Sequence, residues 1–133
     1  MGVTHAYAKL PAEDIERARR FYREAFGLEP YNDVHGHLYY DVAGTPLLIF
    51  PSSGRRSGTH DQFGVVVDSL AEAVRQVIAA GGRLERFPQG PPGTSEQDGI
   101  WFGERMSVAW CSDSEGNLLS LADFAGGSPF RRG

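Results

Sequence analysis

Two segments of the chain place apolar residues at the three- and four-residue spacing of an amphipathic helix. The first covers residues 15–26 (IERARRFYREAF) and the second covers residues 70–80 (LAEAVRQVIAA). Asp14 and Ser69 precede these segments, and both are residue types that cap helix N-termini with a side-chain oxygen. Glu72 follows Ser69 at the spacing of a capping box. The pattern therefore predicts two helices.

Short runs rich in β-branched and aromatic residues surround both helical segments, and turn residues separate most of them. Pro11 is expected to stop the first of these runs. Residues 88–99 (PQGPPGTSEQDG) are too rich in proline and glycine for a helix or strand, so they are expected to form a long loop. The runs that predict eight strands are 4–10, 28–34, 37–43 and 45–51 in the first half, and 62–68, 83–88, 106–112 and 117–124 in the second.

The order strand, helix, strand, strand, strand thus occurs twice. The pair Thr4-His5 recurs as Thr59-His60, an offset of 55 residues, and several positions in the following helix are identical at the same offset. We expect a single α+β domain over residues 1–133, made of two βαβββ modules whose sheet curls into a cup. Its expected parts are module 1 (3–51), a linker (52–58), module 2 (59–125) and a loose tail (126–133).

Composition narrows the range of partners and compartments. The formal net charge of −4 argues against nucleic-acid binding, which usually shows as a basic surplus. No run approaches 18 apolar residues, so no membrane segment is expected. Cys111 is the single cysteine, which excludes an internal disulfide and fits a cytoplasmic protein.

Three stretches give the chain a family resemblance. They are LPAEDIERARRFYREAFGLEP (10–30), QFGVVVDSLAEAV (62–74) and AWCSDSEGNLLSLAD (109–123). In this order and spacing they resemble the vicinal-oxygen-chelate superfamily of glyoxalases, bleomycin-resistance proteins and extradiol dioxygenases. The resemblance implies the glyoxalase/bleomycin resistance/dihydroxybiphenyl dioxygenase-like fold, with the ligand or metal inside the cup. It also implies a homodimer, with modules paired within or between chains.

The same resemblance implies a divalent metal held by the first and last strands of each module. Leucine cannot ligate a metal, neutral serine and tyrosine are poor donors, and glutamine is a weak one. No metal cofactor is therefore predicted. The residues of this sequence that occupy the four family positions are Tyr7, Leu48, Gln62 and Ser120.

Two histidines keep a metal-dependent alternative open. His5 lies two residues before Tyr7, and His60 lies two residues before Gln62. Strand alternation turns each histidine to the same face as its neighbour, so the pair would form a displaced site. In that case the protein would be a metal-dependent lyase, isomerase or dioxygenase.

Aromatic residues at the cup point instead to a flat, partly apolar organic ligand. Trp101 and Trp110 would supply stacking surface, Tyr7, Gln62 and Ser120 would supply polar contacts, and the loop 88–99 would cover the opening. Two functions follow. One is a non-catalytic protein that sequesters a small aromatic or antibiotic-like molecule, as bleomycin-resistance relatives do without a metal. The other is an enzyme that uses a tyrosine, glutamine or serine in place of the ion. The missing metal ligands favour sequestration.

Overall fold

A computed structural model describes residues 2–3, 5–52, 61–125 and 129–130 of the 133-residue chain. The first half contains β1 (Ala8–Ala12), α1 (Ile15–Phe26), β2 (Asn32–Val34), β3 (His37–Val42) and β4 (Thr45–Pro51). The second half contains β5 (Phe63–Val66), α2 (Leu70–Ala79), β6 (Arg83–Glu85), β7 (Ser95–Gln97), β8 (Ile100–Phe102), β9 (Ser107–Ser112) and β10 (Leu118–Asp123).

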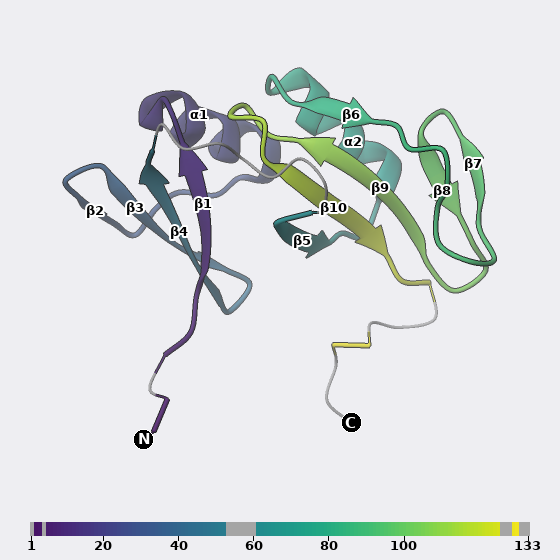
Figure 1. Cartoon of the computed structure of the whole chain (residues 1–133), viewed down its shortest axis with the longest axis horizontal. Coiled ribbons are helices and arrows are strands. Elements are labelled where there is room, and N and C mark those ends of the chain that lie inside the picture. Colours follow the sequence, from purple (N-terminus) through teal and green to yellow (C-terminus); the bar gives the residue numbers. More distant parts are fainter. Residues whose placement is uncertain (1, 4, 53–60, 126–128, 131–133) are drawn as a thin grey trace.

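These strands form two mixed sheets, one for each half of the chain (Figure 1). The first sheet has the order β1-β4-β3-β2, with β1 parallel to β4. The second has the order β5-β10-β9-β8-β7, with β5 parallel to β10, and β6 pairs with β9 as well. Neither sheet closes on itself. The architecture is α+β, as the sequence predicts.

The repeated unit is visible in the pairing of the strands. Ala8 of β1 pairs with Leu47 of β4, and Phe63, 55 residues after Ala8, pairs with Leu119 of β10. Both registers continue in step along the two parallel ladders. Because a slip of one residue would turn every side chain to the other face, matching registers mean that equivalent positions face the same way in both modules.

Both helices cover one face of the sheets, and their apolar stripes form one core. α1 and α2 pack against each other and lie together along the top of the molecule in Figure 1. Phe21 and Tyr22 from α1 and Val77 from α2 are almost fully buried there. Leu10, Ile49 and Leu121 are among the strand residues in the same cluster. No helix in the described ranges is long and apolar enough to cross a membrane.

The two helices begin differently. The Asp14 side chain accepts a hydrogen bond from the backbone N–H of Arg17 at 3.0 Å, as expected for a cap. Ser69 occupies the cap position of α2, but its hydroxyl makes no capping hydrogen bond. Glu72 instead pairs with Arg75 at 2.6 Å, so the predicted capping box does not form.

Two strand predictions are wrong in detail. β1 continues through Pro11 to Ala12, which is possible because β1 is an edge strand and the missing proline N–H leaves no ladder partner unsatisfied. The predicted loop 88–99 contains β7, which pairs with β8, so the described chain has ten strands rather than eight. Most of the expected linker, 53–58, lies outside the described residues, and so does most of the expected tail.

Candidate functional site

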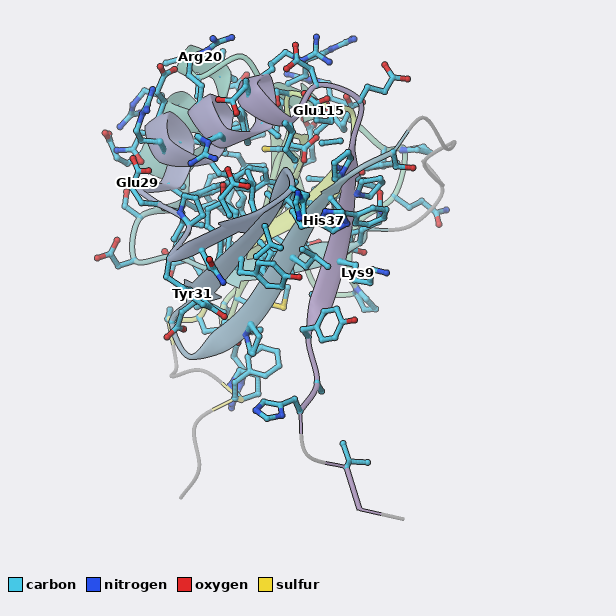
Figure 2. All side chains as sticks on the ribbon, turned by 90° about the vertical axis from the view of Figure 1, so that its left-hand side faces the viewer. Lys9, Arg20, Glu29, Tyr31, His37 and Glu115 are labelled. Carbon is cyan, nitrogen blue, oxygen red and sulfur yellow. The ribbon has the colours of Figure 1, made fainter. Side chains whose placement is uncertain are left out.

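Each sheet has one face turned away from the helices, and this helix-free face carries the candidate site. On the first sheet Leu47 and Ile49 point into the core, so Leu48 between them points the other way. Directly paired residues share a face, which places Tyr39 and Lys9 beside Leu48. Figure 2 shows Lys9 on β1, at one edge of this sheet, and Tyr31 near the other edge. The Lys9 ammonium lies 4.8 Å from the centre of the Phe50 ring.

The second sheet carries the equivalent row of residues. Gly64 of β5 pairs with Ser120 of β10, Ser120 pairs with Trp110 of β9, and Trp110 pairs with Glu85 of β6. Leu119 and Leu121 beside Ser120 belong to the core, so the whole row lies on the helix-free face. Trp110 and Ser120, both predicted from sequence, are therefore direct cross-strand neighbours.

Trp110 and Ser120 line a hollow of about 460 Å³, here called the tryptophan cavity. This volume is within the range of small-molecule sites, and the lining is mainly apolar. The residues around it are Asp61, Gly64, Val65, Val66, Pro91, Met106, Val108, Trp110, Ser120, Ala122, Phe124 and Phe130.

Two other predicted residues lie on the same sheet but outside the lining of this cavity. Trp101 pairs with Val108 and shares its face, yet Gly90 packs so closely on the indole ring that a Cβ atom at Gly90 would overlap it. Gln62 donates its backbone N–H to the carbonyl of Leu118 at 2.7 Å. The Gln62 side-chain oxygen is buried, and no described residue donates a hydrogen bond to it.

Tyr7 and Leu48 lie elsewhere, in a hollow of about 270 Å³ on the first sheet, here called the tyrosine cavity. Tyr7 is 58% exposed at its rim, and Leu48 is buried. Burial raises the pKa of the Tyr40 hydroxyl to about 12, and no described residue bonds to that hydroxyl. Within one chain, therefore, the predicted site residues divide between two sheets. The tyrosine cavity is lined by His5, Ala6, Tyr7, Tyr31, Tyr39, Tyr40, Pro46, Leu47 and Leu48.

The arrangement does not fit a metal at the family positions. Leu48 offers no donor, the neutral hydroxyls of Tyr7 and Ser120 are poor donors, and within one chain these two residues lie on different sheets. In the described ranges no three His, Cys, Asp or Glu residues are grouped so that they would hold an ion. His5 lines the tyrosine cavity, whereas His60 lies outside the described residues.

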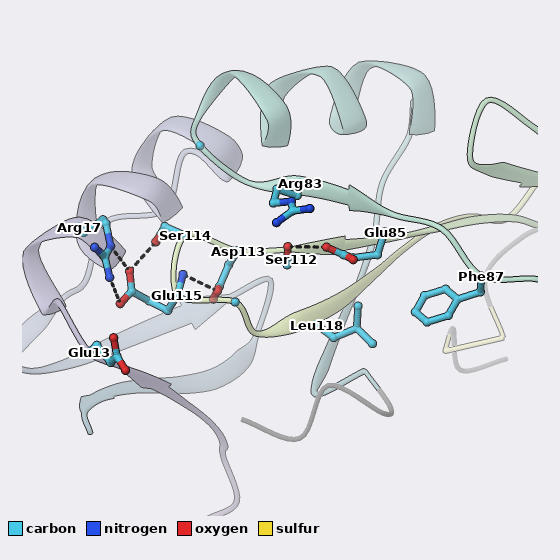
Figure 3. Close-up of a pocket in the computed structure, with 12 residues that line it drawn as sticks. Glu13, Arg17, Arg83, Glu85, Phe87, Ser112, Asp113, Ser114, Glu115 and Leu118 are labelled. Atoms are coloured by element: carbon cyan, nitrogen blue, oxygen red, sulfur yellow. Dashed lines mark hydrogen bonds and ion pairs between the residues drawn. The ribbon is translucent and has the colours of Figure 1, made fainter. Parts of the chain in front are cut away.

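A third hollow, here called the seam cavity, lies where the second sheet meets the start of α1 (Figure 3). Its volume is about 430 Å³, and charged residues dominate its walls. Arg83 and Glu85 of β6 line one wall of it, and Phe87 lies beside them. Glu13 and Arg17, at the N-terminal end of α1, line the opposite wall. The ring of Phe87 meets Trp110 edge-to-face at 5.5 Å, so the seam cavity and the tryptophan cavity are neighbours on one sheet face.

Glu85 is the functional candidate that the sequence analysis missed. Its carboxylate accepts a hydrogen bond from the Ser112 hydroxyl at 3.1 Å. The available signal was the alternation Arg83, Glu85, Phe87 along a predicted strand, with Leu84 on the opposite side. The alternation shows that the three residues share a face, but not which face. The pairing of Glu85 with Trp110 settles this, and the sequence alone does not give that pairing.

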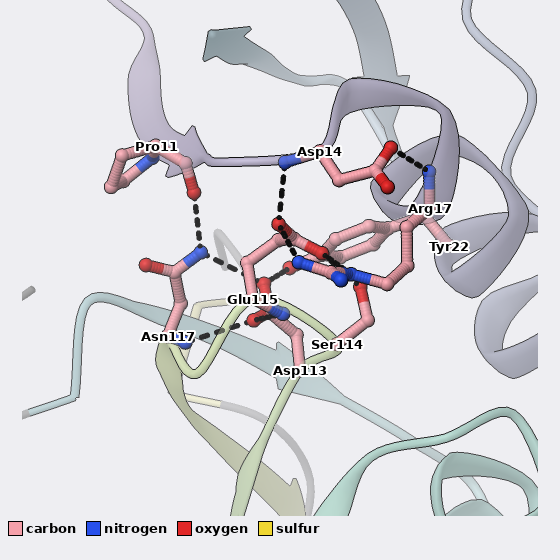
Figure 4. A network of polar contacts seen from close by, with 8 residues as sticks. All are labelled: Pro11, Asp14, Arg17, Tyr22, Asp113, Ser114, Glu115 and Asn117. Carbon is pink, nitrogen blue, oxygen red and sulfur yellow. Dashed lines mark hydrogen bonds and ion pairs between the residues drawn. The ribbon is translucent and has the colours of Figure 1, made fainter. Parts of the chain in front are cut away.

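A polar network joins the β9–β10 turn to the first module (Figure 4). Glu115 accepts two hydrogen bonds from the Arg17 guanidinium, at 2.7 and 3.0 Å, and one from the backbone N–H of Asp14 at 3.0 Å. Burial alone would raise the pKa of Glu115. The hydrogen bonds from Arg17, Asp14 and Ser114 outweigh it, so the pKa lies below its usual value.

The second half of this network surrounds Asp113. Its carboxylate accepts from the Tyr22 hydroxyl at 2.6 Å and from the Asn117 amide at 2.9 Å. The same amide donates to the Pro11 carbonyl at 2.9 Å. Burial raises the pKa of Asp113 in spite of these hydrogen bonds. The network thus holds the two modules, and with them their helix-free faces, in a fixed relation.

Paired βαβββ modules with open, helix-free sheet faces define a class of cup-forming proteins. The sequence agrees with the structure, because a model of the Glyoxalase/Bleomycin resistance protein/Dioxygenase superfamily matches residues 4–121. The chain belongs to this superfamily. No curated protein matches the sequence significantly.

Solved structures share the fold at low sequence identity. The fosfomycin resistance protein FosX from Listeria monocytogenes superposes with a TM-score of 0.69 at 16% identity, covering 97% of each chain. A glyoxalase-related enzyme from Fulvimarina pelagi gives a TM-score of 0.67 at 22% identity, covering 95% of this chain and 96% of that one. A glyoxalase/bleomycin resistance protein from Albidiferax ferrireducens T118 gives 0.63 at 17%, covering 91% and 99%.

Proposed function

We propose that this protein binds a small, partly aromatic molecule against Trp110 and Ser120 without a metal, and so sequesters it. The observation that carries the proposal is the cross-strand pairing of these two residues in the lining of the tryptophan cavity. An indole face beside a hydroxyl suits a flat ligand with one polar group. The structural neighbours include a fosfomycin resistance protein and a glyoxalase/bleomycin resistance protein.

The chemistry of the cavity favours binding over catalysis. Among its described lining residues Asp61 is the one titratable group, and it is exposed. Proton transfer usually needs a histidine or carboxylate held close to the reacting atoms, and the one carboxylate that pairs with the row, Glu85, lies outside this lining. The residues at the family's metal positions also argue against metal-dependent catalysis, because Tyr7, Leu48 and Ser120 do not form a coordination shell.

We also propose that the protein acts as a cytoplasmic homodimer. Both cavities carry large apolar side chains on open surfaces: Tyr31 is 69% exposed at the tyrosine cavity, and Val66 is 48% exposed at the tryptophan cavity. A second copy that set its first sheet against the second sheet of its partner would cover both surfaces and bring Tyr7 near Trp110. Mass measurement in solution tests this, and a monomer at all concentrations would refute it.

A thermal-shift screen of metabolites and antibiotics tests the binding function. A ligand at 100-fold its Kd stabilises the protein by about 2.7 kcal/mol. We expect hits that disappear in Trp110→Ala and persist in Phe102→Ala, a matched control on β8 with an exposed ring. Absence of hits, or turnover of a hit, would refute sequestration.

Elemental analysis tests the metal-free state. Protein purified without chelator should carry no stoichiometric transition metal. A stoichiometric ion that is lost in both His5→Ala and His60→Ala would establish the metal-dependent lyase, isomerase or dioxygenase instead.

A further inference from the structure

The cross-strand row that contains Ser120 and Trp110 ends in a carboxylate. Glu85 pairs directly with Trp110, and both lie on the helix-free face. Opposed residues on neighbouring strands have Cβ atoms about 5 Å apart. A ligand lying on the indole ring would therefore have Ser120 on one side and Glu85 on the other.

No cation in the described part of the chain forms an ion pair with the Glu85 carboxylate, so its negative charge is available to a ligand. Its one hydrogen-bond donor there is the hydroxyl of Ser112, a neutral group. No described arginine, lysine or histidine nitrogen lies within 4.0 Å of it, although Arg83 is two residues earlier on the same face. Glu85 is also partly buried, which weakens the screening of its charge by water.

The rest of this face adds acceptors to the donors that Trp110 and Ser120 offer. The Gln62 side-chain oxygen is buried and receives no hydrogen bond from any described residue. Asp61 is the carboxylate in the lining of the tryptophan cavity, and Glu85 lines the neighbouring seam cavity. Two arginines share the seam cavity with four carboxylates: Glu115 is held by Arg17, and Arg83 faces the same hollow as Glu13, Glu85 and Asp113, so negative charge exceeds positive charge there. A ligand that donates hydrogen bonds is therefore favoured over one that accepts them.

We propose that the ligand is an amine, protonated at neutral pH, joined to an apolar or aromatic body. The ammonium group lies between the Glu85 carboxylate and the Trp110 ring, and the body occupies the tryptophan cavity. A cation gains from the face of an indole as well as from a carboxylate, and the cross-strand pairing of Trp110 with Glu85 places both kinds of group side by side on one sheet face. This inference rests on the proposed binding function and specifies its ligand class.

Three probes of one size and shape isolate the charge: 2-phenylethylamine, 2-phenylethanol and phenylacetate. Their affinities are measured by calorimetry, and the indole N–H signal of Trp110 in NMR spectra reports the site. We expect the amine to bind about tenfold or more tightly than the alcohol, and phenylacetate to bind most weakly. In Glu85→Gln the advantage of the amine should disappear, while Glu104→Gln, an exposed change in the connection between β8 and β9, should keep it.

The outcomes separate this inference from the proposed function. If the alcohol shifts the Trp110 signal as strongly as the amine, or Glu85→Gln leaves their ratio unchanged, the amine class is refuted and binding at Trp110 stands. Tightest binding of phenylacetate would likewise refute it and point to Arg83. If no probe moves the Trp110 signal, both proposals fail. Equal melting temperatures for wild type and Glu85→Gln would show that the variant keeps its fold.

Discussion

Arg17 in the first turn of α1 holds Glu115 of the β9–β10 turn through two hydrogen bonds, although 98 positions separate them in the sequence. The Glu115 carboxylate is almost fully buried and lies at the N-terminal end of α1, where the helix dipole also favours a negative charge. This contact ties the turn of one module to the helix of the other.

Replacing Glu115 by glutamine should lower the free energy of unfolding by about 1–3 kcal/mol at pH 7, because a charge-assisted network becomes a neutral one. Glu72→Gln, which breaks the exposed pair with Arg75, should cost less than about 0.5 kcal/mol. Urea denaturation measures both. Equal losses for the two variants would contradict the structural role of Glu115.

The contribution of Glu115 should depend on pH. Its pKa in the folded protein lies below the ordinary value of 4.5, so the unfolded chain takes up the proton first as the pH falls. The stability gap between wild type and Glu115→Gln should therefore be constant from pH 7 to about 5.5 and shrink as the pH falls through 4.5 towards the folded-state pKa. A gap that widened on acidification would have the wrong sign for this mechanism.

Tyr22→Phe removes the buried hydroxyl that donates to Asp113 at 2.6 Å. Asp113 keeps its hydrogen bond from Asn117, so the expected loss is about 1–3 kcal/mol rather than unfolding. Tyr31→Phe is the matched control, since Tyr31 is 69% exposed and should change stability by about 0.5 kcal/mol or less. Chemical denaturation at pH 7 compares the two.

Gly82→Ala tests how tightly the start of β6 packs against β9 and α1. An added Cβ atom would lie 2.6 Å from the carbonyl oxygen of Ser112 and 3.0 Å from the ring of Phe21 in α1. The Ser112 carbonyl is backbone and cannot move aside cheaply, so we expect a loss of about 1–3 kcal/mol. A thermal melt suffices, and a melting temperature equal to that of wild type would show that the seam is loosely packed.

Cys111 should be chemically silent in the native protein. Burial, with a smaller contribution from Glu85, raises the pKa of its thiol to about 12, so almost no thiolate exists at pH 8. A thiol reagent should therefore label the native protein slowly and titrate one thiol per chain in denaturant. Fast native labelling would contradict the buried placement.

The fold was largely predictable because its signals are local. The apolar stripe and the Asp14 cap fix α1, and the repeated order of elements fixes the two modules. The course of β1 through Pro11 was not predictable, since tolerance of proline depends on which edge of a sheet the strand occupies. The capping box was not predictable either: the Ser69 hydroxyl makes no capping hydrogen bond, and the Glu72 side chain pairs with Arg75.

The candidate site was only half predictable. Alternation along a strand assigns faces, so Ser120 and Trp110 were expected at the cup, and the structure pairs them. Which cavity each residue lines depends on how two sheets are set relative to one another. Tyr7 lies at the first sheet, away from Trp110. Glu85 is recognised as a candidate only because it pairs with Trp110 in the structure.

The β7–β8 hairpin interrupts the second repeat and has no counterpart in the first. β7 forms the outer edge of its sheet, and neither parallel ladder passes through it. Inserted residues at the Asp98–Gly99 turn would therefore leave the registers of both parallel ladders unchanged. For protein engineering this hairpin is a suitable position for an epitope or a fluorescent reporter, next to the proposed ligand-binding face and outside the two parallel ladders.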